Sequence, residues 1–154
     1  MHTAESPLSP LDLDCLRALE AHSVRYLLIG GHAVRAYGSS RNTKDLDVLI
    51  DNTSDNAERF VTAMTSLGIN HSNLTAANII GQKRQINFTS WGYNLEVLTA
   101  ANGIPFEEAY SRRILLSYGG VTIPVLAKVD LIAMKESAGR PKDLEDVGYL
   151  REVV

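Results

Sequence analysis

The sequence contains 154 residues, of which 45% are hydrophobic and 21% charged, a composition typical of a soluble globular protein rather than a disordered chain. The length fits a single domain over residues 1–154, and the net charge of -3 argues against a protein that binds nucleic acid through a general basic excess. No stretch approaches the roughly 20 apolar residues of a membrane span, and the N-terminus lacks a secretory-signal pattern, so we expect a cytoplasmic protein with no membrane partner.

The first predicted elements are a helix and a strand. Residues 9–22 predict a helix with Ser9 as its N-cap, Pro10 at its first position and the only cysteine, Cys15, on its apolar face. A single cysteine cannot form an internal disulfide, so we expect Cys15 to be a core residue. An apolar run over residues 24–30 then predicts a strand.

The second predicted strand follows after a short helix and a loop. The pair Gly30–Gly31 opens a helix over residues 32–37, and the polar residues 39–44 form a loop into a strand over residues 45–50. Residues 54–68 then predict an amphipathic helix, with Ser54 or Asp55 as its cap.

The second half of the sequence predicts hairpins and helices, which makes the fold class α+β, with a mixed β-sheet flanked by helices. Gly119–Gly120 is a strong signal for a two-residue hairpin. Strands are predicted over residues 84–90, 93–100, 114–118 and 121–126, and helices over residues 105–113, 128–139 and 141–153.

Two carboxylates interrupt the strand predicted at residues 45–50. Alternation along a strand places Asp45 and Asp47 on the same face, about 6 to 7 Å apart at their backbone. Two carboxylates at this spacing can share a hard divalent cation such as Mg²⁺, whereas unpaired they repel each other and resist burial. Glu96, inside another predicted strand, is the candidate third carboxylate. Alternatively, Asp45 caps the strand entrance and Asp47 pairs with a core Arg or Lys.

The glycine pair before a helix indicates a phosphate site. Glycine lets the backbone approach a bound anion, and the free N–H groups at a helix start favour phosphate. Phosphate beside a metal is the chemistry of nucleotides, and a third carboxylate completes a site for in-line displacement at phosphorus.

These residues together resemble the signature of the polymerase-β-like nucleotidyltransferases. The signature reads Ile29-Gly30-Gly31, then Asp45-Leu46-Asp47, then Glu96. The stretch RNTKDLDVLI and the tail RPKDLED look like those of small stand-alone bacterial nucleotidyltransferases grouped with abortive-infection toxins, and of lincosamide nucleotidyltransferases. The resemblance implies the nucleotidyltransferase fold.

The resemblance also implies roles for individual residues. Gly30 and Gly31 would hold the triphosphate, Asp45 and Asp47 would bind two Mg²⁺ ions or Mn²⁺, and Glu96 would complete the metal site and act as the base. Glu96 stands where these proteins more often carry Asp.

Cationic side chains are implied as phosphate ligands. Arg41 and Lys135 are the main candidates, and Arg140 and Lys142 are weaker ones. We expect Lys142 and Asp146 to form an i, i+4 pair on a solvated helix face that also carries Asp143.

The implied function is transfer of a nucleoside monophosphate from an NTP to a hydroxyl of an RNA, a protein or a small molecule. Such a protein can belong to a toxin–antitoxin system and act with a partner protein or as a homodimer. The alternative is a catalytically inactive relative that serves as a nucleotide- or partner-binding module. Retention of both aspartates favours the enzyme, and the glutamate at position 96 favours the alternative.

Overall fold

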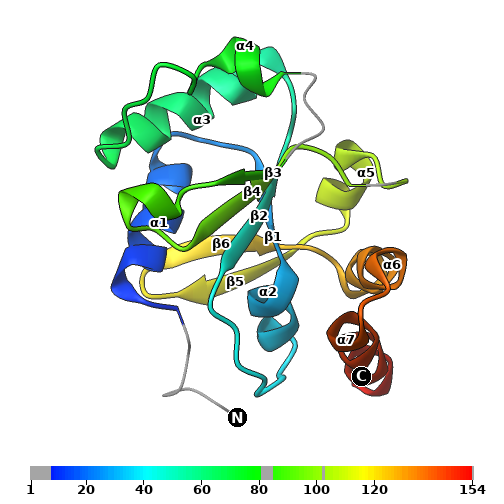
Figure 1. The fold of residues 1–154 in the computed structure, drawn as a ribbon. Coiled ribbons are helices and arrows are strands. Elements are labelled where there is room, and N and C mark those ends of the chain that lie inside the picture. The colour runs from blue at the N-terminus through cyan, green and yellow to red at the C-terminus, as the bar shows by residue number, and fades with distance from the viewer. Residues whose placement is uncertain (1–7, 81–84, 102, 154) are drawn as a thin grey trace.

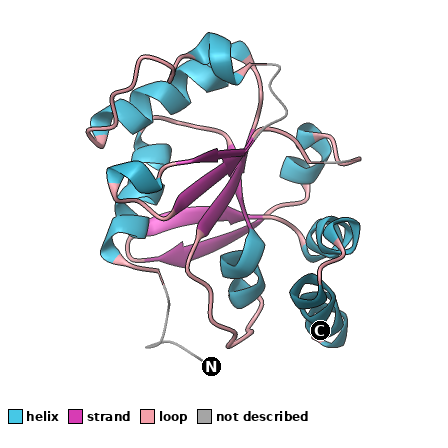
Figure 2. Ribbon diagram, viewed as in Figure 1, coloured by secondary structure: helices cyan, strands magenta, loops and turns pink. Residues whose placement is uncertain are grey.

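The computed structural model describes residues 8–80, 85–101 and 103–153, which form a mixed β-sheet with helices around it (Figures 1 and 2). The strands are β1 (Tyr26–Ile29), β2 (Leu46–Ile50), β3 (Gln85–Asn87), β4 (Leu95–Leu98), β5 (Ile114–Tyr118) and β6 (Val121–Val125). The helices are α1 (Pro10–Ala21), α2 (Gly30–Ala36), α3 (Ser54–Ser66), α4 (Ala76–Ile79), α5 (Phe106–Ser111), α6 (Lys128–Ala138) and α7 (Pro141–Glu152), with a 3₁₀ turn η1 (Thr89–Trp91).

The six strands lie in the order β3-β4-β2-β1-β6-β5. β2 pairs antiparallel with β1 on one side and parallel with β4 on the other. This register places Asp47 of β2 between Ile29 of β1 and Glu96 of β4. Two acids that are about 50 residues apart in the sequence therefore become direct neighbours near the centre of the sheet.

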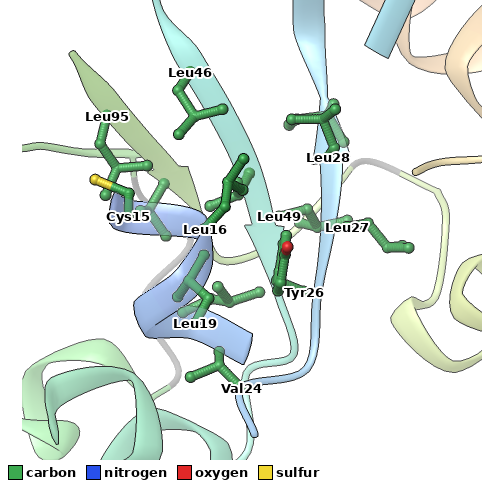
Figure 3. Close-up of a cluster of buried hydrophobic side chains, with 14 of the residues drawn as sticks. Cys15, Leu16, Leu19, Val24, Tyr26, Leu27, Leu28, Leu46, Leu49 and Leu95 are labelled. Carbon is green, nitrogen blue, oxygen red and sulfur yellow. The ribbon is translucent and has the colours of Figure 1, made fainter. Parts of the chain in front are cut away.

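The apolar core lies between the sheet and the helices α1 and α3. Figure 3 shows Cys15, Leu16 and Leu19 of α1 in the same hydrophobic cluster as Leu46 of β2 and Leu95 of β4, and all five side chains are buried. This packing confirms Cys15 as a core residue. Burial raises the pKa of its thiol to about 12, so the thiol is protonated and unreactive at neutral pH.

Several predicted helix ends are confirmed, because local side-chain contacts determine them. Ser9 caps α1 through a hydrogen bond from the backbone N–H of Asp12, with Pro10 in the first turn. Pro141 likewise opens α7. The hairpin between β5 and β6 turns at Gly119–Gly120, both with positive φ.

Several elements differ from the predictions in their boundaries, and one helix was not predicted. α2 begins at Gly30 rather than at residue 32, and the N-cap of α3 is Thr53 rather than Ser54 or Asp55. α4 was not predicted, because its four residues are too few to show the 3.6-residue spacing of apolar side chains that indicates a helix. The strand predicted over residues 84–90 is present only as β3, and residue 84 lies outside the described residues.

In Figure 1, α6 and α7 lie side by side on the opposite side of the strands from α1 and α3. This pair of helices faces the acidic part of the sheet across a pocket, which is described below. Within the described ranges, no helix has the length and apolar character that a membrane crossing needs.

Candidate active site

A pocket of about 280 Å³ lies between the sheet and the α6–α7 pair. One wall carries Asp45, Asp47 and Glu96 from the start of β2 and from β4, next to Gly30. The other wall carries Lys135 of α6, Lys142 and Asp143 of α7, and Arg140, the residue that caps α7. The apolar side chains of Ile29, Leu98, Leu131 and Met134, together with Ala138, and the polar side chain of Gln85 complete the lining.

The acidic wall is built by strand pairing. Asp47 and Glu96 are register partners on parallel strands, which places their backbones about 4.8 Å apart. Asp45 precedes Asp47 by two residues and lines the same pocket, as the predicted alternation requires. The alternate residues Leu46 and Val48, on either side of Asp47 in the sequence, are fully buried on the other face of the sheet.

Among the described residues, none forms an ion pair with Asp45, Asp47 or Glu96. Burial and the negative charges of Glu96 and Asp45 raise the pKa of Asp47 to about 7. Burial and the charge of Asp45 also raise the pKa of Glu96. The acids are thus close enough to repel one another, and the described residues include no cation that forms the ion pair with Asp47 that the alternative interpretation expects.

Gly30 makes room for this acidic wall. Its φ of +71° lies in the left-handed region, and a Cβ at this position would lie 2.2 Å from Oδ2 of Asp47. Any side chain at position 30 would therefore push the Asp47 carboxylate out of place.

Gly31 has a different environment. It is buried, and a Cβ there would lie 2.3 Å from Nη1 of Arg41 and 2.4 Å from Oγ1 of Thr43. The loop before β2 packs directly on this glycine, and neither Gly31 nor Arg41 lines the pocket. Of the predicted site residues, the three acids, Gly30 and Lys135 therefore line the pocket, whereas Gly31 and Arg41 do not.

Two acids of α7, Asp143 and Asp146, form ion pairs with Lys135 and Arg140 of the helical wall and with Arg41 behind it. Nζ of Lys135 lies 3.4 Å from Oδ1 of Asp143 and 3.0 Å from Oδ2 of Asp146. Arg140 contacts Asp143 at 2.6 Å, and Nε of Arg41 lies 3.3 Å from Oδ1 of Asp146. The network links α6, α7 and the loop before β2.

The expectation of a solvated face with a Lys142–Asp146 pair is therefore wrong. Asp143 has no exposed surface and Asp146 is only 4% exposed, because the start of α7 packs against α6. Asp146 pairs with Lys135 and Arg41 instead of with Lys142. The i, i+4 spacing of Lys142 and Asp146 gave no signal of this arrangement, and only the packing of α7 reveals it.

The acidic wall fits a divalent cation by its chemistry. All three groups are hard oxygen donors, and a cation would relieve the repulsion that raises the pKa of Asp47. In the side-chain conformations present, no three His, Cys, Asp or Glu groups of the described ranges form a ready-made metal cluster. The carboxylates would therefore have to turn toward an ion to hold it.

Comparison with known proteins gives matches in structure alone. No protein-family model matches the chain, and neither does any curated protein. The lincosamide antibiotic adenylyltransferase LnuA, solved with lincomycin bound, is similar with a TM-score of 0.62 and 17% identity over 100% of both chains. A predicted nucleotidyltransferase from Thermotoga maritima has a TM-score of 0.57 and 13% identity, over 98% of this chain and 94% of that one.

A third similar structure is an antigenic nucleotidyltransferase-like protein from Paracoccidioides brasiliensis, with a TM-score of 0.51 and 15% identity over 96% of this chain and 76% of that one. All three neighbours belong to one structural class, and two of them match over nearly their full length. The chain therefore has the nucleotidyltransferase fold, as its sequence signature implied. Of the signature residues, Ile29, Gly30, Asp45, Asp47 and Glu96 line the acidic pocket.

Proposed function

We propose that the protein is a metal-dependent nucleotidyltransferase that moves a nucleoside monophosphate from an NTP to the hydroxyl of an RNA, a protein or a small molecule. One observation carries the proposal. Asp47 and Glu96 are neighbours on parallel strands, with Asp45 beside them, and these acids form no ion pair with the described residues. They face Lys135, Arg140 and Lys142 across one pocket. The nucleotidyltransferase fold of the chain supports the same activity.

Asp45, Asp47 and Glu96 would hold the metal, with Mg²⁺ as the expected ion. When bound, the cation would offset the negative charge of the phosphates and of the three carboxylates. The cationic wall would bind the remaining phosphate oxygens through Lys135, Arg140 and Lys142. A triphosphate would then lie between two walls that carry opposite charges.

The reaction forms one bond and breaks one bond at the α-phosphorus. The acceptor oxygen bonds to phosphorus while the bond to the bridging oxygen of the leaving group breaks, and pyrophosphate departs with that electron pair. The hydroxyl proton passes to a carboxylate, for which we propose Glu96. Glu96 lines the pocket and is the strand neighbour of Asp47, so its carboxylate is placed to accept this proton.

The experiment that tests the proposal is calorimetric titration of each NTP in the presence of Mg²⁺. The wild type is compared with the double variant Asp45→Asn/Asp47→Asn, and any nucleotide that binds is then assayed for pyrophosphate release with RNA, protein and small-molecule acceptors. Metal-dependent binding that the double variant loses would support the proposal. If no NTP binds to the wild type, the proposal is wrong and the fold serves another purpose.

A further inference from the structure

Asp143 is a buried acid at the edge of the pocket, and it anchors a cation that faces the pocket. Its carboxylate accepts hydrogen bonds from Nε of Arg140 at 2.6 Å and from Nη2 at 3.2 Å. It also accepts one from the backbone N–H of Arg140 at 3.2 Å. Arg140 itself is 61% exposed at its side chain, so Asp143 fixes a side chain that would otherwise move freely in solvent.

Asp143 also restrains Lys135, together with Asp146. The ammonium of Lys135 has three donors, and these two carboxylates lie 3.4 Å and 3.0 Å from it. The guanidinium of Arg140 has five N–H donors, of which Nε and one on Nη2 point to Asp143. Both cations therefore keep donors that Asp143 does not use, and both line the pocket.

The same two cations are attracted to the acidic wall across the pocket. Lys135 and Arg140 line the same pocket as Asp47 and Glu96, and opposite charges attract each other. Yet no ion pair joins either cation to these acids in the described part of the chain. The contacts with Asp143 hold the cations on the helical side of the pocket, and this keeps both walls available to a ligand.

We propose that Asp143 is a positioning residue that holds Arg140 and Lys135 on the helical wall in the orientation that binds the phosphates of the substrate. This inference rests on the proposed function, because it assumes that a phosphate chain enters the pocket. It adds a role for an acid whose charge alone would repel that phosphate chain.

The sign of the effect separates positioning from simple electrostatics. If only net charge mattered, removal of an acid near the pocket would strengthen phosphate binding. If Asp143 positions the two cations, its removal weakens binding, because binding would then have to immobilise the exposed side chain of Arg140 and a Lys135 side chain that only Asp146 still restrains. We expect the Asp143→Asn variant to bind roughly tenfold more weakly.

The experiment measures binding of inorganic tripolyphosphate with Mg²⁺ by calorimetry, a probe that contains the phosphates shared by all NTPs. The control is Glu145→Gln, which removes an exposed acid two residues further along α7. We expect affinity about tenfold lower for Asp143→Asn and within about twofold of the wild type for Glu145→Gln. Unchanged or tighter binding by folded Asp143→Asn would overturn the inference.

A second variant keeps the test decisive if Asp143→Asn does not fold. Arg140→Lys preserves the charge of an exposed side chain but cannot form the two-point contact with Asp143. Weaker binding by this variant supports positioning, and wild-type affinity overturns it.

In the transfer assay, a positioning role raises the KM for the NTP more than it lowers kcat, whereas partial unfolding lowers kcat alone. If the wild type does not bind tripolyphosphate at all, the proposed function itself fails.

Discussion

The substitution Asp47→Asn should stabilise the metal-free protein at alkaline pH, because it removes a half-buried charge that forms no ion pair with the described residues. Burial, with the charges of Glu96 and Asp45, raises the pKa of Asp47 from 3.8 to about 7 in the folded protein. The folded state therefore binds a proton that the unfolded state releases at lower pH. The resulting stability is complete below pH 3.8 and is lost as the pH rises through about 7.

The size of the effect follows from the shift in pKa. A shift from 3.8 to about 7 corresponds to about 4 kcal/mol of unfolding free energy over the whole window, at about 1.4 kcal/mol per pKa unit. Part of this loss has already occurred at pH 5, where the unfolded carboxylate is ionised. Between pH 5 and pH 8 we expect the wild type to lose about 2 to 3 kcal/mol relative to Asp47→Asn.

The assay is urea unfolding of both proteins at pH 5 and pH 8 with EDTA present. Glu145→Gln is the matched control, because it removes an exposed carboxylate and should show the same pH dependence as the wild type. The stability difference between Asp47→Asn and the wild type should therefore change between pH 5 and pH 8. If it is the same at both pH values, the pKa of Asp47 is not raised in the folded protein, and the interpretation that these carboxylates repel one another is refuted.

Three further substitutions test how the site and its support are built. Gly30→Ala should abolish metal-dependent NTP binding in calorimetry, since its Cβ would lie 2.2 Å from Asp47; wild-type affinity would contradict this. Ser9→Ala should lower the unfolding free energy by about 1 kcal/mol through loss of the α1 cap, and no change in urea unfolding would contradict it. Phe60→Ala should cost about 3 to 5 kcal/mol in the same assay, because Phe60 is fully buried; a cost below about 1 kcal/mol would show that its site collapses.

Short-range patterns in the sequence were sufficient for most of the fold. Some features act within a few residues, so the local order of residues is enough to predict them. Examples are the cap at Ser9, the prolines that open α1 and α7, and the glycines of the β5–β6 turn. Helix α4 and the exact start of α2 were not predicted. Helices this short have too few residues to show the 3.6-residue spacing of apolar side chains.

The acidic wall could be predicted because an acid within an apolar strand is unusual by itself. Asp47 and Glu96 each interrupt such a strand, and the pairing of β2 with β4 brings them together. The helical wall could not be predicted in the same way. Asp143 and Asp146 lie in a stretch rich in charged residues, and their burial depends on how α7 packs against α6.

The glycine pair shows where sequence reasoning was incomplete. A phosphate role was expected for both residues, and only Gly30 lines the pocket. Gly31 lies under Arg41 and Thr43, so its small size has a packing reason that no local pattern reveals. The same contact explains why Arg41 lies behind the pocket, where Asp146 holds it.

The most direct test of the proposed active site is a titration with Mn²⁺ followed by electron paramagnetic resonance, with and without a non-hydrolysable NTP analogue. The wild type should bind Mn²⁺, and more tightly when the analogue is present, because the phosphates add ligands to those of Asp45, Asp47 and Glu96. The double variant Asp45→Asn/Asp47→Asn should lose this binding. Equal Mn²⁺ binding by the wild type and the double variant would contradict a metal-dependent active site at these residues.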